Sequence, residues 1–338
     1  MLGDYIAYNK IFYHPDRIDA YLKGDIVRPI SVKMRLTDAC NLKCYYCSYK
    51  DNLNSGSIDF ENALKVLEKL SQIGVRSIVF TGGEPTCYRY FKDVVKAAKE
   101  IFDFDLGLIT NGVIYPDVLE YLTWVRFSLD TVDAKTFERI KGVNALSSVL
   151  SNINRVIQQK STSNPELTVG IQAVVNRYNF DYMFKAIKDI IEYAINVKAD
   201  YFQIRPLEND KYDEGELHII KDNLITLKRS DQKIKILCTD YKWDEVANGY
   251  VKEYEGCPSA DFIGSVDVKG DFYICCAMIN DETAKYGNLL KDKTRYILEN
   301  RKAVQGKFDY SKCTLACQGS LFNRTLNSFK NIKHKNFI

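Results

Sequence analysis

Apolar runs and helical repeats alternate along this 338-residue chain. Runs of apolar and β-branched residues predict strands at 31–36, 75–80, 104–109, 124–129, 168–175 and 200–205. Between them, apolar residues recur at helical spacing over 59–73, 88–101, 133–141, 146–159 and 181–196. A strand–helix alternation of this kind favours a parallel sheet with right-handed crossovers, and therefore an α/β fold.

The first strand–helix unit carries clear boundary signals. Asp59 lies in the first turn of its helix, where a negative charge is favourable toward the helix dipole. Gly74 follows the last apolar position, as expected for a residue that ends a helix in the left-handed conformation. The run 75–80 is apolar at most positions, which is typical of a strand buried on both faces.

The chain divides into three parts. Residues 1–30 are mixed, with a possible helix at 15–22, and are interpreted as a segment that caps a barrel. Residues 31–210 hold the regular alternation and are predicted to form the core. After Leu207 the pattern changes, with a helix expected at 217–229 and a strand at 233–238. A cysteine-bearing region follows from 257, and 211–338 is assigned to this C-terminal part.

Composition excludes several classes of function. The formal net charge is +3, from 47 basic and 44 acidic residues, which gives no electrostatic case for nucleic acid binding. No run approaches the roughly 18 apolar residues of a membrane span, and residues 1–10 lack the apolar core of a signal peptide. We therefore expect a cytoplasmic protein with no membrane partner. Its ten cysteines then indicate metal binding rather than secreted disulfides.

Three cysteines crowd one loop directly after the first predicted strand. Cys40, Cys44 and Cys47 have the spacing C-x3-C-x2-C. Three thiolates on one loop can hold three irons of an iron–sulfur cube and leave the fourth iron open. A zinc loop is the alternative, although structural zinc normally has four protein ligands. The open cluster is the favoured interpretation, because no further His or Cys lies within about thirty residues downstream.

Further motifs follow the next strands in order. They are Gly82-Gly83-Glu84-Pro85, then Thr110-Asn111-Gly112, then Ser128-Leu129-Asp130. With the aromatic Tyr46 just before the last loop cysteine, this set resembles the radical S-adenosylmethionine (radical SAM) enzymes. The resemblance implies a partial (β/α)6 TIM-like barrel whose chemistry gathers at the carboxyl ends of the strands.

The same resemblance implies a cofactor site. The cysteine loop would hold the [4Fe–4S] cluster that binds SAM, and Gly82, Gly83 and Glu84 would bind the methionine amine. The remaining SAM contacts that it implies are Tyr46, Asn111, Ser128, Arg139 and Leu207. Asp130 is expected to cap the following helix instead. An electron donor such as flavodoxin or ferredoxin is implied as a partner.

A second set of cysteines lies near the C-terminus. Cys257 and Cys275 frame the pattern C-x12-G-x4-C around Gly270, and Cys313 and Cys317 follow as C-x3-C. Four thiolates can close a complete [4Fe–4S] site or a structural zinc site. The pattern resembles the shortened auxiliary-cluster region of the SPASM/twitch radical SAM subgroup, which implies one auxiliary [4Fe–4S] cluster. Cys276 adjoins Cys275 and is an alternative ligand.

Three residues are candidates for direct chemistry. Arg205 ends the sixth predicted strand, and Glu208 follows it. Either would bind a substrate hydroxyl or take a proton, or else form a salt bridge at the rim of the barrel. Cys276, like Cys238, would be a hydrogen-atom donor to a substrate radical if the reaction were an epimerisation. Most free cysteines are simply small buried residues.

These observations predict a radical SAM oxidoreductase. The 5′-deoxyadenosyl radical would take a hydrogen atom from a small polar substrate, most plausibly a sugar, aminosugar or cyclitol, and oxidise it. A maturase or epimerase acting on a ribosomally made peptide is the alternative. A GTP enzyme of the molybdenum-cofactor type is less favoured, because its C-terminal cysteine spacing differs.

Overall fold

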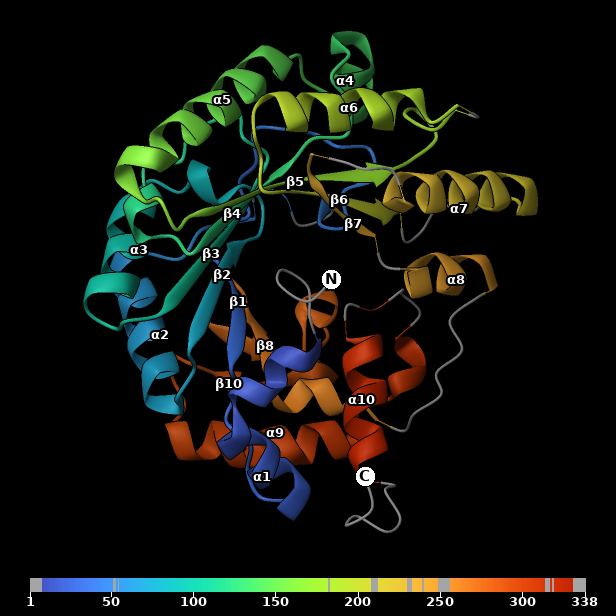
Figure 1. The fold of residues 1–338 in the computed structure, drawn as a ribbon. Helices are drawn as coiled ribbons and strands as arrows, with labels where there is room; N and C mark the ends of the chain where they lie inside the picture. Colours follow the sequence, from blue (N-terminus) through green and yellow to red (C-terminus); the bar gives the residue numbers. More distant parts are fainter. Residues whose placement is uncertain are drawn as a thin grey trace.

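Ten strands form one sheet in the order β10-β9-β8-β1-β2-β3-β4-β5-β6-β7. This arrangement comes from a computed structural model of the chain. It describes residues 8–50, 53, 55–181, 183–207, 212–229, 233–238, 240–248, 256–313, 317 and 319–330. The sheet curves inside a ring of helices and is not closed, because its order begins at β10 and ends at β7 (Figure 1). The predicted α/β fold with a partial barrel is confirmed.

Where the sequence predicted a strand or helix, up to residue 238, the observed bounds agree to within a few residues. The strands are β1 (Ser31–Arg35), β2 (Ser77–Thr81), β3 (Asp105–Thr110), β4 (Trp124–Ser128), β5 (Thr168–Val175), β6 (Tyr201–Pro206), β7 (Lys235–Cys238), β8 (Ile263–Val266), β9 (Asp271–Tyr273) and β10 (Lys285–Asn288). The helices are α1 (Pro15–Lys23), α2 (Phe60–Ile73), α3 (Phe91–Glu100), α4 (Ala134–Lys141), α5 (Leu146–Ser163), α6 (Lys185–Asn196), α7 (Glu214–Arg229), α8 (Asp240–Asn248), α9 (Thr294–Lys307) and α10 (Ser320–Lys330).

Strands β1 to β7 are all parallel, so their carboxyl ends lie at one edge of the sheet. The C-terminal region extends this sheet, because β8 pairs in parallel with β1, from Ser31 beside Ile263 to Met34 beside Val266. Strands β9 and β10 then add antiparallel pairs. One continuous sheet therefore joins the cysteine loop after β1 to the C-terminal cysteine region.

Local capping explains where the helices begin and end. The Asp59 side chain accepts a hydrogen bond from the backbone N–H of Asn62 and caps α2, and Gly74 ends that helix with a φ of 93°. Asp133 caps α4 by accepting a hydrogen bond from the N–H of Thr136. The expectation that Asp130 caps this helix is wrong, because that role belongs to Asp133.

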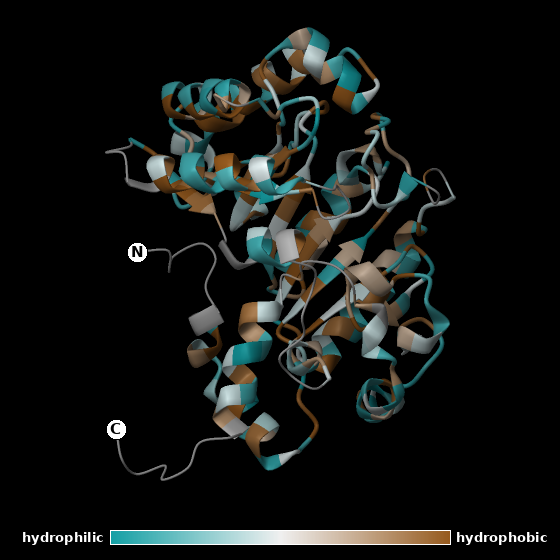
Figure 2. Cartoon of the chain, turned by 90° about the vertical axis from the view of Figure 1, so that its right-hand side faces the viewer, coloured by the Kyte–Doolittle hydropathy of each residue, from teal (hydrophilic) through white to brown (hydrophobic). Residues whose placement is uncertain are grey.

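The two faces of the sheet differ in polarity. Phe127 of β4 faces the helices, since a Cβ on Gly112 would meet both its ring and Val149 of α5. Its neighbours Arg126 and Ser128 therefore point to the opposite, concave face, because side chains alternate along a strand. Figure 2 shows hydrophobic stretches along the central strands and mixed colouring on the surrounding helices. The apolar core lies mainly between the sheet and its helices.

The N-terminal helix packs on the C-terminal region. A small apolar cluster joins Ile11, Tyr21 and Val27 to Phe262 and Leu326. None of the helices in the described ranges has the length and apolar character needed to cross a membrane.

Candidate active site

The loop that follows β1 carries Cys40, Cys44 and Cys47, and all three side chains are partly exposed. A bridge between Thr37 and Ser57 closes the base of this loop. Burial raises the pKa of the Cys40 thiol to about 11, and it raises the pKa of Cys44 as well. The three thiols thus lie together at a strand end, partly shielded from water.

The Gly-Gly-Glu-Pro loop after β2 packs directly against this cysteine loop. The N–H of Gly83 donates to the carbonyl of Thr37 at 3.1 Å, and the N–H of Glu84 donates to the carbonyl of Ala39 at 2.8 Å. A Cβ on Gly83 would lie 2.2 Å from the Ala39 oxygen, and Gly82 has a φ of 133°. Only glycine allows this approach and this backbone conformation. The two motifs form one structural unit.

The Glu84 carboxylate is buried and organises the neighbouring strand ends. Its Oε1 accepts hydrogen bonds from the N–H and hydroxyl of Thr86 and from the hydroxyl of Thr110. Its Oε2 accepts one from the N–H of Asn111 at 2.7 Å. Burial raises the pKa of Glu84, and these hydrogen bonds oppose that rise. Glu84 therefore holds the ends of β2 and β3 together beside the cysteine loop.

The end of α4 supports the other side of the cysteine loop. The N–H of Lys43 donates to the carbonyl of Lys141 at 2.8 Å, and the N–H of Tyr45 donates to that of Ile140 at 3.1 Å. A Cβ on Gly142 would lie 2.8 Å from the Lys43 oxygen. The loop is consequently held between the Gly-Gly-Glu-Pro turn and α4.

A buried ion pair lies beneath Tyr46. The Lys141 ammonium lies 2.6 Å from the Asp130 carboxylate, and their side chains are 2% and 0% exposed. The Tyr46 hydroxyl donates to Asp130 and accepts from Lys141 at 2.9 Å. Burial alone would lower the pKa of Lys141, but Asp130 and Tyr46 raise it well above its usual value. Burial and the Asp130 charge likewise raise the pKa of Tyr46. This network ties Tyr46 of the cysteine loop to Asp130 and Lys141.

The structure brings some of the other predicted SAM-binding residues to this site. The Asn111 amide donates to Asn41 Oδ1 at 2.7 Å and lies 3.9 Å from Cys40 Sγ. Ser128 lies at the end of β4 on the concave face. Leu207 follows β6, and its N–H donates to the Tyr212 hydroxyl. All three follow or end a parallel strand at the edge of the cysteine loop.

Arg139 contacts none of these residues in the described part of the chain. Its side chain is exposed on α4, and its guanidinium carbon is 4.2 Å from the centre of the Tyr178 ring. No contact in the described chain joins it to Ser128. Its role toward SAM stays a prediction.

The four C-terminal cysteines share one neighbourhood. Burial raises the pKa of Cys275 most, with further contributions from Cys276, Cys317 and Cys257. Burial also raises the pKa of Cys317, to about 11. Cys257 and Cys313 both contribute to a raised pKa of Tyr310, although burial is the main cause there. The thiols come from three separate stretches of the chain, so this grouping is a product of the fold.

Amide groups also approach two of these sulfurs. The side-chain amide of Asn323 donates to Cys257 Sγ at 3.6 Å, and the N–H of Gly319 donates to Cys317 Sγ at 3.2 Å. Within the described residues, no three His, Cys, Asp or Glu side chains lie close enough to hold one metal ion. Each thiolate of a cluster site binds a cluster iron, so cluster ligation does not need one shared ion. The donor set fits a cluster.

The two leftover cysteines of interest lie on opposite faces of the sheet. Cys276 Sγ accepts a hydrogen bond from Lys33 Nζ at 3.2 Å, and Lys33 lies on the concave face of β1. Cys238 is buried on the helix-covered face, where it accepts a hydrogen bond from the Trp243 indole. The expectation that Cys238 approaches the substrate is therefore wrong, whereas Cys276 faces the barrel interior.

Polar residues on the concave face were not all anticipated. Arg205 of β6 lies there, whereas Glu208 falls outside the described residues. Arg126 of β4 and Lys33 of β1 also point to this face and were not singled out. The sequence signal that could have identified both residues is a charged side chain in the middle of an otherwise apolar predicted strand.

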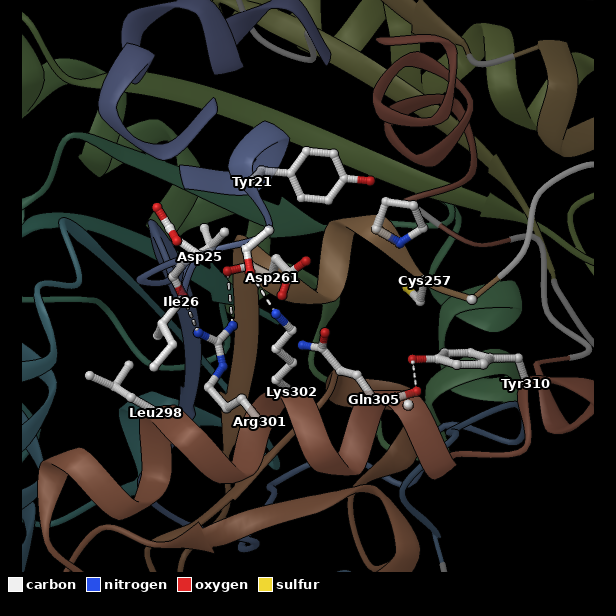
Figure 3. A pocket seen from close by; sticks show the side chains of 15 residues that line it. Tyr21, Asp25, Ile26, Cys257, Asp261, Leu298, Arg301, Lys302, Gln305 and Tyr310 are labelled. Carbon is white, nitrogen blue, oxygen red and sulfur yellow. Dashed lines mark hydrogen bonds between the residues drawn. The ribbon is translucent and has the colours of Figure 1, made fainter. Parts of the chain in front are cut away.

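A separate cavity of about 290 Å³ lies between α1, the turn at Pro258–Asp261 and α9 (Figure 3). Arg301 lies beside it and donates to the carbonyls of Val27, Ala260 and Asp261. Lys302 reaches the carbonyl of Gly24 at 2.5 Å. Cys257 borders this cavity, whereas the cysteine loop and the neighbouring carboxyl ends of the strands do not line it. The basic residues of α9 thus tie the N-terminal segment to the C-terminal region.

With this geometry established, comparison with known proteins identifies the class. Residues 34–214 match the family model of the radical SAM superfamily. Because this match spans more than half of the chain, the chain belongs to this superfamily. It is 31% identical over 199 residues to the GTP 3′,8-cyclase of Synechocystis sp., covering 56% of each chain. It is 30% identical over 221 residues to a probable GTP 3′,8-cyclase of Saccharolobus islandicus, covering 61% of this chain and 69% of that one. The chain thus spans little more than half the length of the first of these relatives.

Solved structures share the fold of most of the chain. SuiB from Streptococcus suis, crystallised with the precursor peptide SuiA, has a TM-score of 0.67 at 17% identity. That match covers 92% of this chain and 76% of SuiB. The structure of anSMEcpe with bound AdoMet and a peptide has a TM-score of 0.59 at 17% identity, covering 88% of each chain. The prediction of a radical SAM core with a cysteine-bearing C-terminal extension is confirmed.

Proposed function

We propose that this chain holds a [4Fe–4S] cluster at Cys40, Cys44 and Cys47, cleaves SAM, and oxidises a small polar substrate. When bound, a cluster of this kind would supply the electron that cleaves SAM into methionine and a 5′-deoxyadenosyl radical, and this radical would take a hydrogen atom from the substrate. Cys257, Cys275, Cys313 and Cys317 would hold one auxiliary [4Fe–4S] cluster. The protein itself binds and orients SAM and the substrate, and it excludes water from the site.

One observation carries this proposal: the hydrogen-bonded unit of the cysteine loop and the Gly-Gly-Glu-Pro turn. The two backbone bonds from Gly83 and Glu84 place the turn against the loop that holds the thiols. Buried Glu84 then fixes Asn111 beside Cys40. A cluster and the amino acid end of SAM would thus meet polar groups from three adjacent strand ends.

The concave face supports a polar substrate. Lys33, Arg126, Gln172, Gln203 and Arg205 all point to this face, from β1, β4, β5 and β6. Such side chains suit a hydroxylated or charged molecule better than an apolar one. Arg205 would bind substrate, and a proton released during oxidation would pass to a base near the end of β6, where Glu208 is the candidate.

Nucleotide cyclisation is the second candidate. It is favoured by the relatives named GTP 3′,8-cyclase, which match at 30–31% identity over 199–221 residues. The C-terminal cysteine spacing argues for the first candidate. Peptide modification, suggested by the precursor peptide bound to SuiB, is an alternative that the shared fold alone does not favour. Incubation of the reconstituted protein with SAM and GTP, and separately with sugars and cyclitols, distinguishes the candidates by mass spectrometry of the products.

Replacement of Glu84 by Gln is expected to weaken SAM binding about ten- to hundredfold, because one charge-assisted hydrogen bond contributes about 1.5–3 kcal/mol. Both clusters should remain, since no cysteine is changed. Equilibrium SAM binding and iron content are the measurements. Glu138→Gln, on the exposed face of α4, is the matched control and should bind SAM normally. Unchanged affinity in the Glu84 variant would make Glu84 a purely structural residue.

Replacement of Cys276 by Ala separates oxidation from epimerisation. In an oxidation, the substrate radical would pass an electron to the proposed auxiliary cluster and a proton to a base, and no thiol would donate a hydrogen atom. The variant should then lose only part of its activity, through the lost contact with Lys33, and 5′-deoxyadenosine should form one-to-one with a ketone product. An epimerase would instead form 5′-deoxyadenosine without product in this variant, and its wild-type product would carry solvent deuterium at the reacting carbon.

A further inference from the structure

Arg126 occupies an unusual position in the middle of β4. Its neighbour Phe127 packs toward α5, so the guanidinium points to the concave face of the sheet. That face also carries the ends of Lys33 and Arg205, two further cations. Apolar residues normally fill this kind of strand interior, so a charged side chain here requires a specific explanation.

Neighbouring side chains hold the Arg126 guanidinium in place. Its Nη1 donates to Gln203 Oε1 of β6 at 2.9 Å, and its Cζ lies 5.7 Å from the centre of the Trp124 ring. Two glycines make room for the flanking aromatic rings. A Cβ on Gly107 would lie 2.3 Å from the Trp124 indole, and a Cβ on Gly170 would lie 2.1 Å from the Tyr201 ring. Arg126 is therefore positioned before any ligand binds.

No carboxylate neutralises this cation in the described part of the chain, where no ion pair to Arg126 occurs. Its Nε is buried without a hydrogen-bond acceptor, and the neighbouring Gln172 Oε1 is buried without a donor. Burial lowers the pKa of Arg126, and the nearby Arg205 lowers it further, although Tyr201 opposes the change. Burying an unpaired charge costs several kcal/mol, so a bound anion would relieve an existing cost.

We infer that Arg126, with Arg205 beside it, binds a phosphate group of the substrate. The unpaired Gln172 Oε1 would accept a hydrogen bond from a hydroxyl or N–H of the same molecule. The substrate class is thus a polyhydroxylated phosphate compound, such as a sugar phosphate or a nucleotide. This inference rests on the proposed function, because it places the substrate on the concave face beside the cysteine loop.

Calorimetric titration of the reconstituted protein tests this inference. The probes are inorganic pyrophosphate, GTP and neutral myo-inositol, all at one fixed ionic strength so that non-specific screening is constant. We expect both phosphate probes to bind the wild-type chain. Arg126→Gln should weaken them at least about tenfold, since a hydrogen bond to a charged group contributes about 1.5–3 kcal/mol. Arg155→Gln is the matched control, because Arg155 also stacks on an aromatic ring, Tyr115, but on the helix side.

The outcomes are distinct. Equal binding by wild type and Arg126→Gln, or no binding of either phosphate probe by wild type, overturns the inference. Binding of myo-inositol with neither phosphate probe also overturns it. Should Arg126→Gln not fold, Arg126→Lys keeps the charge but loses the planar fork, and a several-fold weaker pyrophosphate affinity is then expected. Reductive SAM cleavage by the wild-type chain without any anion tests the proposed function separately.

Discussion

Simultaneous replacement of Cys40, Cys44 and Cys47 by alanine is expected to abolish reductive SAM cleavage. The reconstituted wild type should contain about eight irons, from two four-iron clusters, and the triple variant about four. The reason is that all three ligands of the first site lie on one loop, whereas the C-terminal thiols come from separate positions. Iron and sulfide analysis, together with 5′-deoxyadenosine formation under reduction, measures both effects.

Cys238→Ala is the control for this prediction. Its sulfur packs against Trp243 on the helix-covered face, so about eight irons and SAM cleavage should remain. A triple variant that still holds about eight irons would show that the loop is not a cluster site. A wild type with about four irons and zinc at the C-terminal cysteines would contradict the auxiliary-cluster proposal.

Lys141→Met is expected to lower the free energy of unfolding by about 3–5 kcal/mol, because it leaves the Asp130 carboxylate buried without its partner. The Tyr46 hydroxyl loses its donor as well, so the cysteine loop should hold its cluster less firmly. Urea unfolding and iron retention after gel filtration measure these effects. The double variant Asp130→Asn with Lys141→Met should recover part of the stability, since the isolated charge is gone.

Lys185→Met provides the comparison for a surface pair. Lys185 lies 2.6 Å from Asp189, but its side chain is 75% exposed, so water screens the pair and its loss should change stability much less than the loss of Lys141. The folded-state pKa of Lys141 is raised above its usual 10.5, so its contribution is fully present below that pH and is lost only as the pH rises further. The stability difference between wild type and Lys141→Met should therefore not fall as the pH rises from 6 to about 8. A difference that disappears over this rise would contradict this account.

Much of the fold was predictable because local patterns and tertiary packing agree. The strands β1 to β6 and the helices between them have the periodicities that their burial requires. The C-terminal strands were harder to predict. β8 to β10 are only three or four residues long, and the pairing of β8 with β1 joins segments more than two hundred residues apart.

The sequence by itself determined the class of site, because ligand spacing is a local property. C-x3-C-x2-C places three thiols on one loop, and Gly82-Gly83 permits a close approach of backbone in any surrounding structure. Only the tertiary structure decided the pairing of Asp130 with Lys141 and Tyr46, the opposite placements of Cys276 and Cys238, and the lack of an ion pair to Arg126 among the residues that the structure describes. These features depend on which face of a strand meets which distant element. Which face meets which element depends on the curvature of the sheet and the packing of its layers, and a short stretch of sequence does not determine either.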